Sequence, residues 1–189
     1  CSYSYWSAYT GAEASKLNDL AGMTAGEVTA SISGDKTQLT TTTLANVAST
    51  DVVALDLSTT MSSDAELTQL RQLRAQTGGK ITGTVSAAIA KLKASAATGL
   101  TTVGTDSIAL TITDAPLGDA DRADLEALLA KTSGVTTATA SFGKTAFNAF
   151  AASNASDSSD EITLTATGDA LSAANFNAAK ANTNAGITA

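Results

Sequence analysis

Residues 65–87 read AELTQLRQLRAQTGGKITGTVSA. Leu70 and Leu73 lie three residues apart, which places both on one face of a helix, and Thr77 follows where that helix would stop. Two glycines then lead into residues 81–85, where apolar and polar residues alternate as they do in a strand with one buried face. The stretch therefore predicts a short amphipathic helix, a glycine turn and a strand.

The end of this helix has counterparts elsewhere in the chain. The pattern of two apolar residues followed by a threonine recurs as Leu17-Leu20-Thr24, Leu125-Leu128-Thr132 and Phe176-Ala179-Thr183. Successive threonines are 53, 55 and 51 residues apart. A glycine follows each threonine within three residues, at positions Gly26, Gly79, Gly134 and Gly186. We expect these glycines to end the helices with a positive φ.

A second motif has the same period. Asp51, Asp106 and Asp160 each begin a run with apolar residues at alternate positions, and they are 55 and 54 residues apart. Two independent motifs with one period predict an internal repeat of about 54 residues.

The order of the motifs predicts the fold. Each expected strand is joined to the next by an expected helix, which favours parallel strands with right-handed crossovers. Alternate positions of the strands are Thr or Ser, whereas a sheet covered on both faces has nearly continuous apolar strands. We therefore predict an α/β solenoid of β-α-β-α units, with helices on one face and a Thr/Ser-rich exposed sheet face. A Rossmann-like or other compact α/β domain, and two separate sheets for the two kinds of strand, are the alternatives.

The repeat suggests one domain over residues 1–189. Its expected parts are a partial repeat at 1–11, repeats at about 12–64, 65–121 and 122–175, and a partial repeat at 176–189. Two further helices are expected at 38–48 and 87–97, and Ser63 with Glu66 has the spacing of a capping box.

Composition excludes several classes of function. The chain has 18 acidic against 11 basic residues, a net charge of −7, and no basic run, which argues against a nucleic-acid partner. No apolar run reaches the roughly 20 residues of a membrane span. Histidine is absent and Cys1 is the only cysteine, so a Ser/His/Asp triad, a structural zinc site and an internal disulfide are all excluded. Cys1 at the first position would also suit a processed lipoprotein.

Carboxylates are the remaining candidates for chemistry or for metal binding. Acidic residues cluster before an expected helix, at Asp114, Asp119, Asp121 and Asp124, where they would favour the helix dipole. We expect no catalytic residues. The three repeat aspartates could bind calcium with help from Thr105, Asp157 or Ser158, but turn and cap roles are favoured because equivalent strands of one sheet are about 9–10 Å apart.

The first nine residues hold all three tyrosines and the only tryptophan. Aligned on the helix motif, Tyr3 and Tyr5 take the positions of Ile162 and Leu164, so the chain begins inside a repeat. These aromatic residues either cover the end of the core or join a neighbouring subunit. The candidate subunit contacts are Tyr3, Tyr5, Trp6, Tyr9 and, at the other end, Ile187.

The polar face of the sheet is a candidate binding surface. Its threonines could form a flat array of hydroxyls that binds glycan or ice, or could reflect ordinary β propensity on a solvent face. These residues are Thr29, Thr82, Thr84, Thr111, Thr113, Thr163 and Thr165.

Residues 160–189, DEITLTATGDALSAANFNAAKANTNAGITA, resemble the tandem repeats of giant bacterial surface proteins, in particular cyanobacterial cell-surface and swimming-motility proteins. The resemblance implies an extracellular, non-enzymatic, structural or adhesive role. Partners would be the same protein, through head-to-tail association or neighbouring repeats, and glycans in the adhesive alternative. Whether the chain is a fragment or a subunit that polymerises stays open.

Overall fold

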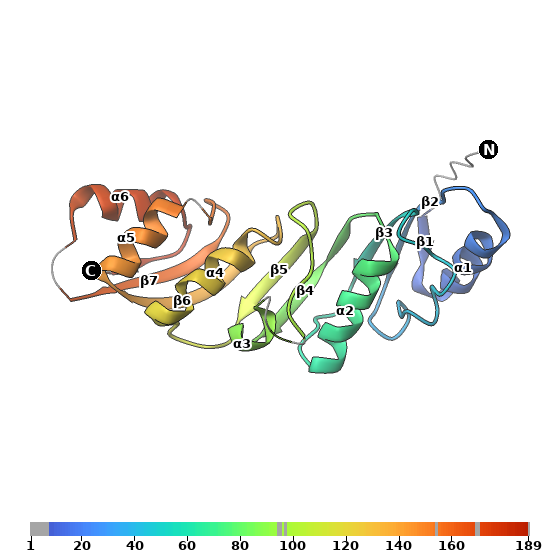
Figure 1. Cartoon of the computed structure of the whole chain (residues 1–189), viewed down its shortest axis with the longest axis horizontal. Helices are drawn as coiled ribbons and strands as arrows, with labels where there is room; N and C mark the ends of the chain where they lie inside the picture. Colours follow the sequence, from blue (N-terminus) through green and yellow to red (C-terminus); the bar gives the residue numbers. More distant parts are fainter. Residues whose placement is uncertain (1–7, 94–95, 97, 154, 169–170, 189) are drawn as a thin grey trace.

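The computed structural model describes residues 8–93, 96, 98–153, 155–168 and 171–188, which form one parallel sheet with helices against it (Figure 1). The strands are β1 (Ala8–Thr10), β2 (Thr29–Gly34), β3 (Val52–Leu57), β4 (Ile81–Ala87), β5 (Ser107–Ile112), β6 (Thr136–Gly143), β7 (Glu161–Thr167) and β8 (Ile187–Thr188). Their order in the sheet follows the chain, and every neighbouring pair is parallel. The prediction of parallel strands is confirmed, and the alternative of two separate sheets is wrong.

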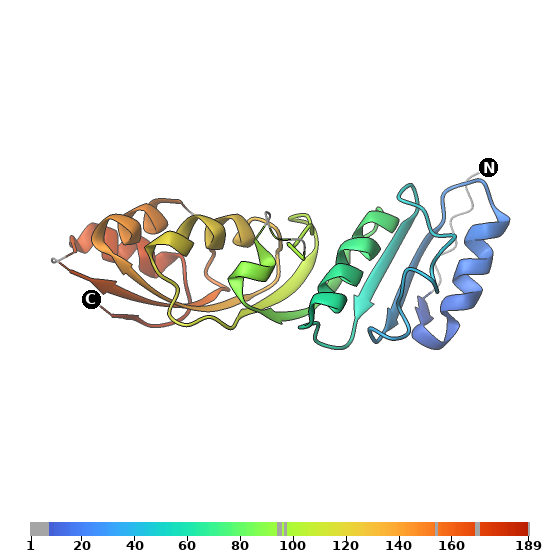
Figure 2. The same cartoon turned by 60° about the horizontal axis from the view of Figure 1, so that its bottom comes forward.

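Helical segments occupy most connections between these strands. They are η1 (Gly11–Glu13), α1 (Ala14–Met23), α2 (Asp64–Gln76), α3 (Ile89–Leu92), η2 (Asp119–Asp121), α4 (Arg122–Leu129), α5 (Lys144–Ser153) and α6 (Ala173–Ala181). Figure 2 shows α2, α4, α5 and α6 along the same side of the sheet. Within the described residues, no helix is both long enough and apolar enough to span a bilayer.

Burial alternates along the strands, as a sheet covered on one face requires. In β2, Ala30 and Ile32 are buried while Ser31 and Ser33 are exposed, and β3, β5 and the first half of β7 alternate in the same way. A doubly wound sheet would bury both sets of residues, so the Rossmann-like alternative is wrong. The inward residues of the strands meet leucines of the helices in one apolar core that includes Leu17, Leu70, Leu73, Leu125 and Leu128.

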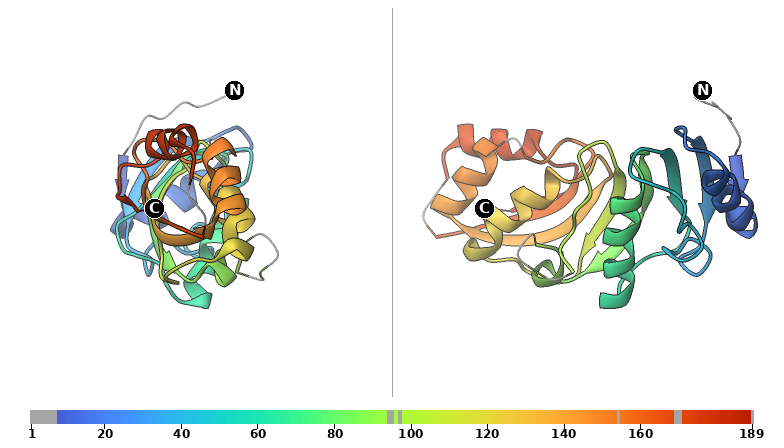
Figure 3. Two further views of the ribbon diagram at one scale, coloured as in Figure 1. Left: turned by 90° about the vertical axis from the view of Figure 1, so that its left-hand side faces the viewer. Right: turned by 45° about the vertical axis from the view of Figure 1, so that its right-hand side comes forward.

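The strands are staggered in a regular way. β2 and β3 are paired over six residues, as are β4 and β5, and β6 and β7 are paired over seven. By contrast, β3 with β4 and β5 with β6 are paired over only two residues each. Leu55 lies beside Ile81, and Leu110 lies beside Thr136, so β4 and β6 each begin next to the second half of the preceding strand. Figure 3 shows the resulting sheet twisting along the long axis of the molecule.

The helix expected at 38–48 is absent, because threonine hydroxyls hold this segment in turns. The backbone N–H of Thr40 donates to the Thr43 hydroxyl at 2.8 Å, and that hydroxyl donates to the Gln38 carbonyl at 2.7 Å. Such side-chain bonds offer the backbone an alternative to the helix. Leu39, Leu44 and Val47 still point into the core.

Residues 38–48 connect β2 to β3. The corresponding connections from β4 to β5 and from β6 to β7 do contain helices. Within the described part of residues 87–97, which leaves out 94, 95 and 97, the expected helix is confirmed only as the four-residue α3, whereas α5 has ten residues. Phe147 and Phe150 of α5 are buried, and the rings of Phe142 and Phe150 have centroids 5.8 Å apart. These large side chains fill the space over β6, whose inward residues include Ala138 and Ala140.

The capping box expected at the start of α2 is confirmed. The Ser63 hydroxyl accepts from the N–H of Glu66 at 3.3 Å, and the Glu66 carboxylate accepts from the N–H groups of Ser62 and Ser63 at 2.7 and 3.0 Å. The hydrogen bond from Lys36, followed by those from the two backbone N–H groups, lowers the pKa of Glu66 to about 2. Glu66 is therefore ionised over the physiological pH range and holds its helix cap there.

The glycines after the helices have a different role from the one expected. Among the described glycines only Gly168 has a positive φ, of 96°. A Cβ at Gly79 would lie 2.3 Å from the carbonyl carbon of Val53, and one at Gly134 would lie 2.5 Å from that of Ile108. Glycine is required at these two positions because the chain passes directly against the neighbouring strand.

Candidate functional site: strand starts, open face and sheet edges

The three repeat aspartates are buried caps that join loops to strands. Asp51 accepts from the N–H groups of Val28 and Ala48 at 2.9 and 2.8 Å. Asp106 accepts from Ile81 and Val103 at 2.8 and 3.0 Å, and Asp160 from Thr136 and Asp157 at 2.7 and 3.0 Å. In each case one bond reaches the start of the preceding strand and the other closes a turn three residues upstream. The cap and turn roles favoured by the sequence are confirmed.

The threonines at the helix ends form the other half of the same junction. The Thr77 hydroxyl accepts from the N–H of Val53 at 3.1 Å and donates to the Val53 carbonyl at 2.6 Å. Thr132 binds Ile108 in the same way at 2.7 and 2.7 Å, and Thr183 binds Ile162 at 2.9 and 2.9 Å. Each hydroxyl also accepts from the N–H two residues downstream, as does Thr24. One side chain thus satisfies several backbone groups that would otherwise be buried without partners.

Asp106 has a counter-ion, Arg74, that no sequence pattern indicates. The Arg74 guanidinium lies 2.7 Å from the fully buried carboxylate of Asp106 and also donates to the Thr77 carbonyl. The pair links α2 to the start of β5, 32 residues later in the chain. No spacing rule connects Arg74 to Asp106, so the sequence carries no signal for this pair.

At Asp160, burial raises the pKa of the carboxyl above its usual value.

The acidic cluster before α4 is divided among separate partners. Asp114 accepts from the N–H of Ile89 at 2.6 Å, Asp119 from Gly143 at 2.7 Å, and Asp121 from Gly118 at 3.0 Å, while Asp124 lies 3.6 Å from the Lys93 ammonium. Across the described residues, no group of three or more His, Cys, Asp or Glu is placed to hold a metal ion.

The predicted threonine face lies on the side of the sheet away from the helices. Thr84, Thr111, Thr113 and Thr163 are exposed, and Thr29, Thr82 and Thr165 are half-buried. Register places Thr111 beside Thr137 and Thr139 beside Thr163 on adjacent strands. The hydroxyls therefore form short rows across the face, and the twist of the sheet turns each row relative to the next.

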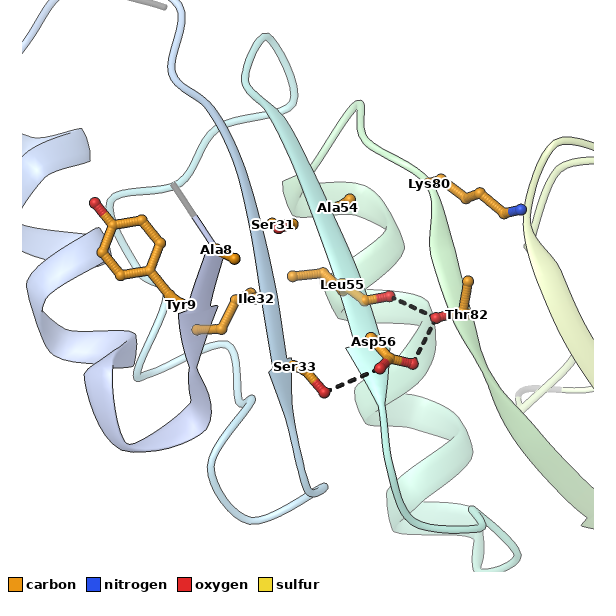
Figure 4. A pocket seen from close by; sticks show the side chains of 10 residues that line it. All are labelled: Ala8, Tyr9, Ser31, Ile32, Ser33, Ala54, Leu55, Asp56, Lys80 and Thr82. Carbon is orange, nitrogen blue, oxygen red and sulfur yellow. Dashed lines mark hydrogen bonds between the residues drawn. The ribbon is translucent and has the colours of Figure 1, made fainter. Parts of the chain in front are cut away.

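A groove of about 240 Å³ crosses the same face near the N-terminal end of the sheet (Figure 4). Asp56 lies on its floor, where the carboxylate accepts from the hydroxyls of Ser33 at 2.9 Å and Thr82 at 2.7 Å. These bonds tie the side chains of β2, β3 and β4 together across the open face. No sequence pattern distinguishes Asp56, because it occupies an ordinary polar position of an alternating strand.

The outermost described strands, β1 and β8, each pair on one side only. Tyr9 of β1 lies beside Ile32, and both Tyr9 and Ile187 are half-buried against the core. The other candidate contacts, Tyr3, Tyr5 and Trp6, lie outside the described residues. Exposed strand edges offer unpaired backbone groups to another strand.

Comparison with known protein families, curated proteins and solved structures finds no match to this chain.

Proposed function

We propose that the chain is a repeat module of a non-enzymatic, extracellular structural protein, built from β-α-β-α units of about 54 residues that extend by adding strands at the sheet edges. The observation that carries the proposal is the recurrence of one junction. Asp51, Asp106 and Asp160 make the same pair of backbone contacts, and Thr77, Thr132 and Thr183 make the same bonds to the strand that each aspartate begins.

The strands at the two edges of the sheet are of different kinds, and the two kinds alternate within the sheet. Strands that begin after a buried aspartate alternate in the sheet with strands that follow a helix-ending threonine. β8 follows Thr183 and belongs to the second kind, whereas β1 precedes α1 as β3 precedes α2 and belongs to the first. A further β1 beside β8 would therefore continue the alternation. The neighbour is either another repeat of the same polypeptide or a second copy, and head-to-tail contacts that do not close generate a filament.

The β8 edge has backbone groups available for such a neighbour. The N–H of Leu164 donates to the Gly186 carbonyl at 3.0 Å, so Gly186 faces β7 and the next residue, Ile187, directs its own N–H and C=O toward the free edge. The extracellular assignment is supported by the resemblance to bacterial surface repeats and by the composition, and the open threonine face would form the outer surface of the assembly.

Ile187→Pro tests the edge because it removes the outward N–H without removing a bond to β7. In sedimentation velocity at increasing protein concentration, we expect the unmodified chain to form end-to-end oligomers. Ile187→Pro should weaken this association about tenfold or more, since a lost interfacial hydrogen bond and strand geometry together cost at least about 1.4 kcal/mol.

Ile187→Val is the matched control, because it keeps the N–H and the β-branched side chain, and it should associate like the unmodified chain. Strictly monomeric particles at all concentrations, with and without calcium, would contradict association between separate chains. Equal association of the Pro and Val variants would exclude β8 as the contact.

A further inference from the structure

The apolar core is only partly covered at the end of the sheet formed by β7 and α6 (Figure 1). Four side chains of this end are half-buried: Ala166, Leu171, Phe176 and Ile187. The residues at the equivalent places earlier in the chain are at most 5% exposed, and they are, in the same order, Leu57 and Ile112, Met61 and Leu117, Leu70 and Leu125, and Ile81 and Thr136. The earlier places therefore have a cover that this end, as far as the described residues reach, does not have.

At the earlier places the cover is the second half of the next strand. The N–H of Met61 donates to the Thr84 carbonyl at 2.9 Å, and the Met61 carbonyl accepts from the N–H of Ser86 at 2.9 Å. Leu117 makes the same pair of bonds with β6, both at 2.8 Å. Met61 and Leu117 each lie one or two residues before the N-cap of a helical segment, so β4 and β6 hold the chain where it enters that segment.

Leu171 lies directly before the N-cap of α6, but no strand among the described residues runs past it. Ile187 lies beside Leu164 as Ile81 lies beside Leu55, so β8 takes the place at which β4 begins. The described β8 has two residues, whereas β4 has seven. The open part of the core is therefore one strand wide, and it continues the line of β8.

We propose that this opening receives a strand that continues β8 and is followed by a helix, as β6 is followed by α5. The inference rests on the proposed repeat, but it concerns the cover of the core rather than the pairing of a further strand at the edge. The segment that fits has apolar residues at alternate positions of the strand and large apolar residues on the helix. In β6 and α5 these roles belong to Ala138, Ala140, Phe147 and Phe150, which are all buried.

A chain extended after Ala189 by a copy of residues 139–153 tests the proposal. Ile187-Thr188-Ala189 then stands for Thr136-Thr137-Ala138, because Ile187 follows Thr183 at the distance at which Thr136 follows Thr132. Hydrogen exchange at the amide of Leu171, followed by NMR, should slow about tenfold or more, since this N–H gains the bond that Leu117 makes with β6. The amide of Met61 is the internal reference and should exchange as before, because its bond to β4 is already present.

The matched control is the same extension with Ala140→Asp and Phe142→Asp in the added copy, which keeps its length. Both positions face the core in β6, and a carboxylate buried there without a partner opposes docking. The control should leave exchange at Leu171 within about twofold of the unextended chain. Unchanged exchange with the apolar extension, or equal slowing with both extensions, overturns the proposal. Unfolding or aggregation of the apolar extension alone also counts against it.

The opening could instead receive a second copy of the chain, and the same measurement distinguishes this occupant. If concentrating the unextended chain slows exchange at Leu171 as much as the apolar extension does, the proposed occupant is wrong. Association that Ile187→Pro weakens, without protection of Leu171 in the extended chain, would leave the proposed function standing while this inference fails. Protection of Leu171 in an extended chain that never associates would support this inference and contradict association between separate chains.

Discussion

Asp106→Ala should lower the free energy of unfolding by about 3–5 kcal/mol, the cost of breaking a buried ion pair by removing one partner. The Asp106 carboxylate is fully buried and accepts from Arg74, from the N–H of Ile81 and from the N–H of Val103. Its removal leaves the Arg74 guanidinium without its counter-ion and leaves two backbone donors unpaired. Urea unfolding followed by far-ultraviolet circular dichroism measures the loss.

Asp64→Ala is the control for Asp106→Ala, because it also removes an aspartate that pairs with a cation. The Asp64 carboxylate lies 2.6 Å from the Lys91 ammonium, but its side chain is 66% exposed. An exposed pair of this kind contributes about 0–1 kcal/mol. Equal losses for the two variants would show that the junction at Asp106 does not stabilise the fold in the way its contacts indicate.

Gly79→Ala should destabilise the fold by about 3 kcal/mol or more, although it adds a single methyl group. The new Cβ would lie 2.3 Å from both the carbonyl carbon and the carbonyl oxygen of Val53, and 2.6 Å from the backbone nitrogen of Ala54. These are backbone atoms in a buried strand, so no side-chain rotation relieves the overlap, and β3 would have to separate from the turn. Thermal unfolding and urea unfolding both measure this effect.

Gly186→Ala is the control, since it makes the same change at the glycine three residues after Thr183, where a Cβ would have no atom within 4 Å. It should leave stability within about 0.5 kcal/mol of the unmodified chain. A neutral Gly79→Ala, or a loss at Gly186 as large as that at Gly79, would contradict the close approach between turn and strand.

Local patterns were sufficient to predict much of this fold. The helices expected between strands predicted that the strands run parallel, and the alternation in residues 81–85 predicted a strand with one apolar face. The aspartates and threonines were placed correctly at strand starts and helix ends because one-dimensional spacing and helix geometry determine both positions. Ser63 and Glu66 form the expected cap for the same reason.

Features that depend on contacts between distant segments could not be predicted in this way. Residues 38–48 have the spacing of a helix, but the hydroxyls of Thr40 and Thr43 satisfy the backbone locally and favour turns. The ion pair of Arg74 with Asp106 arises from how α2 and the start of β5 lie together in the folded chain. Gly79 was identified, but for a positive φ rather than for its approach to Val53, because only the folded chain brings those two segments together.

If the proposed repeat is right, units of about 54 residues are interchangeable along the sheet. Asp51 and Asp106 hold equivalent positions, so residues 52–106 can be inserted twice after Asp106, and each copy then contains its own Arg74 and Asp106 as well as the backbone partners of that aspartate. Small-angle X-ray scattering should show the longest dimension increasing by about 19 Å, the width of four added strands at about 4.8 Å each, with the cross-section unchanged. An insertion that unfolds, or that enlarges the molecule without lengthening it along one axis, would contradict the proposed repeat.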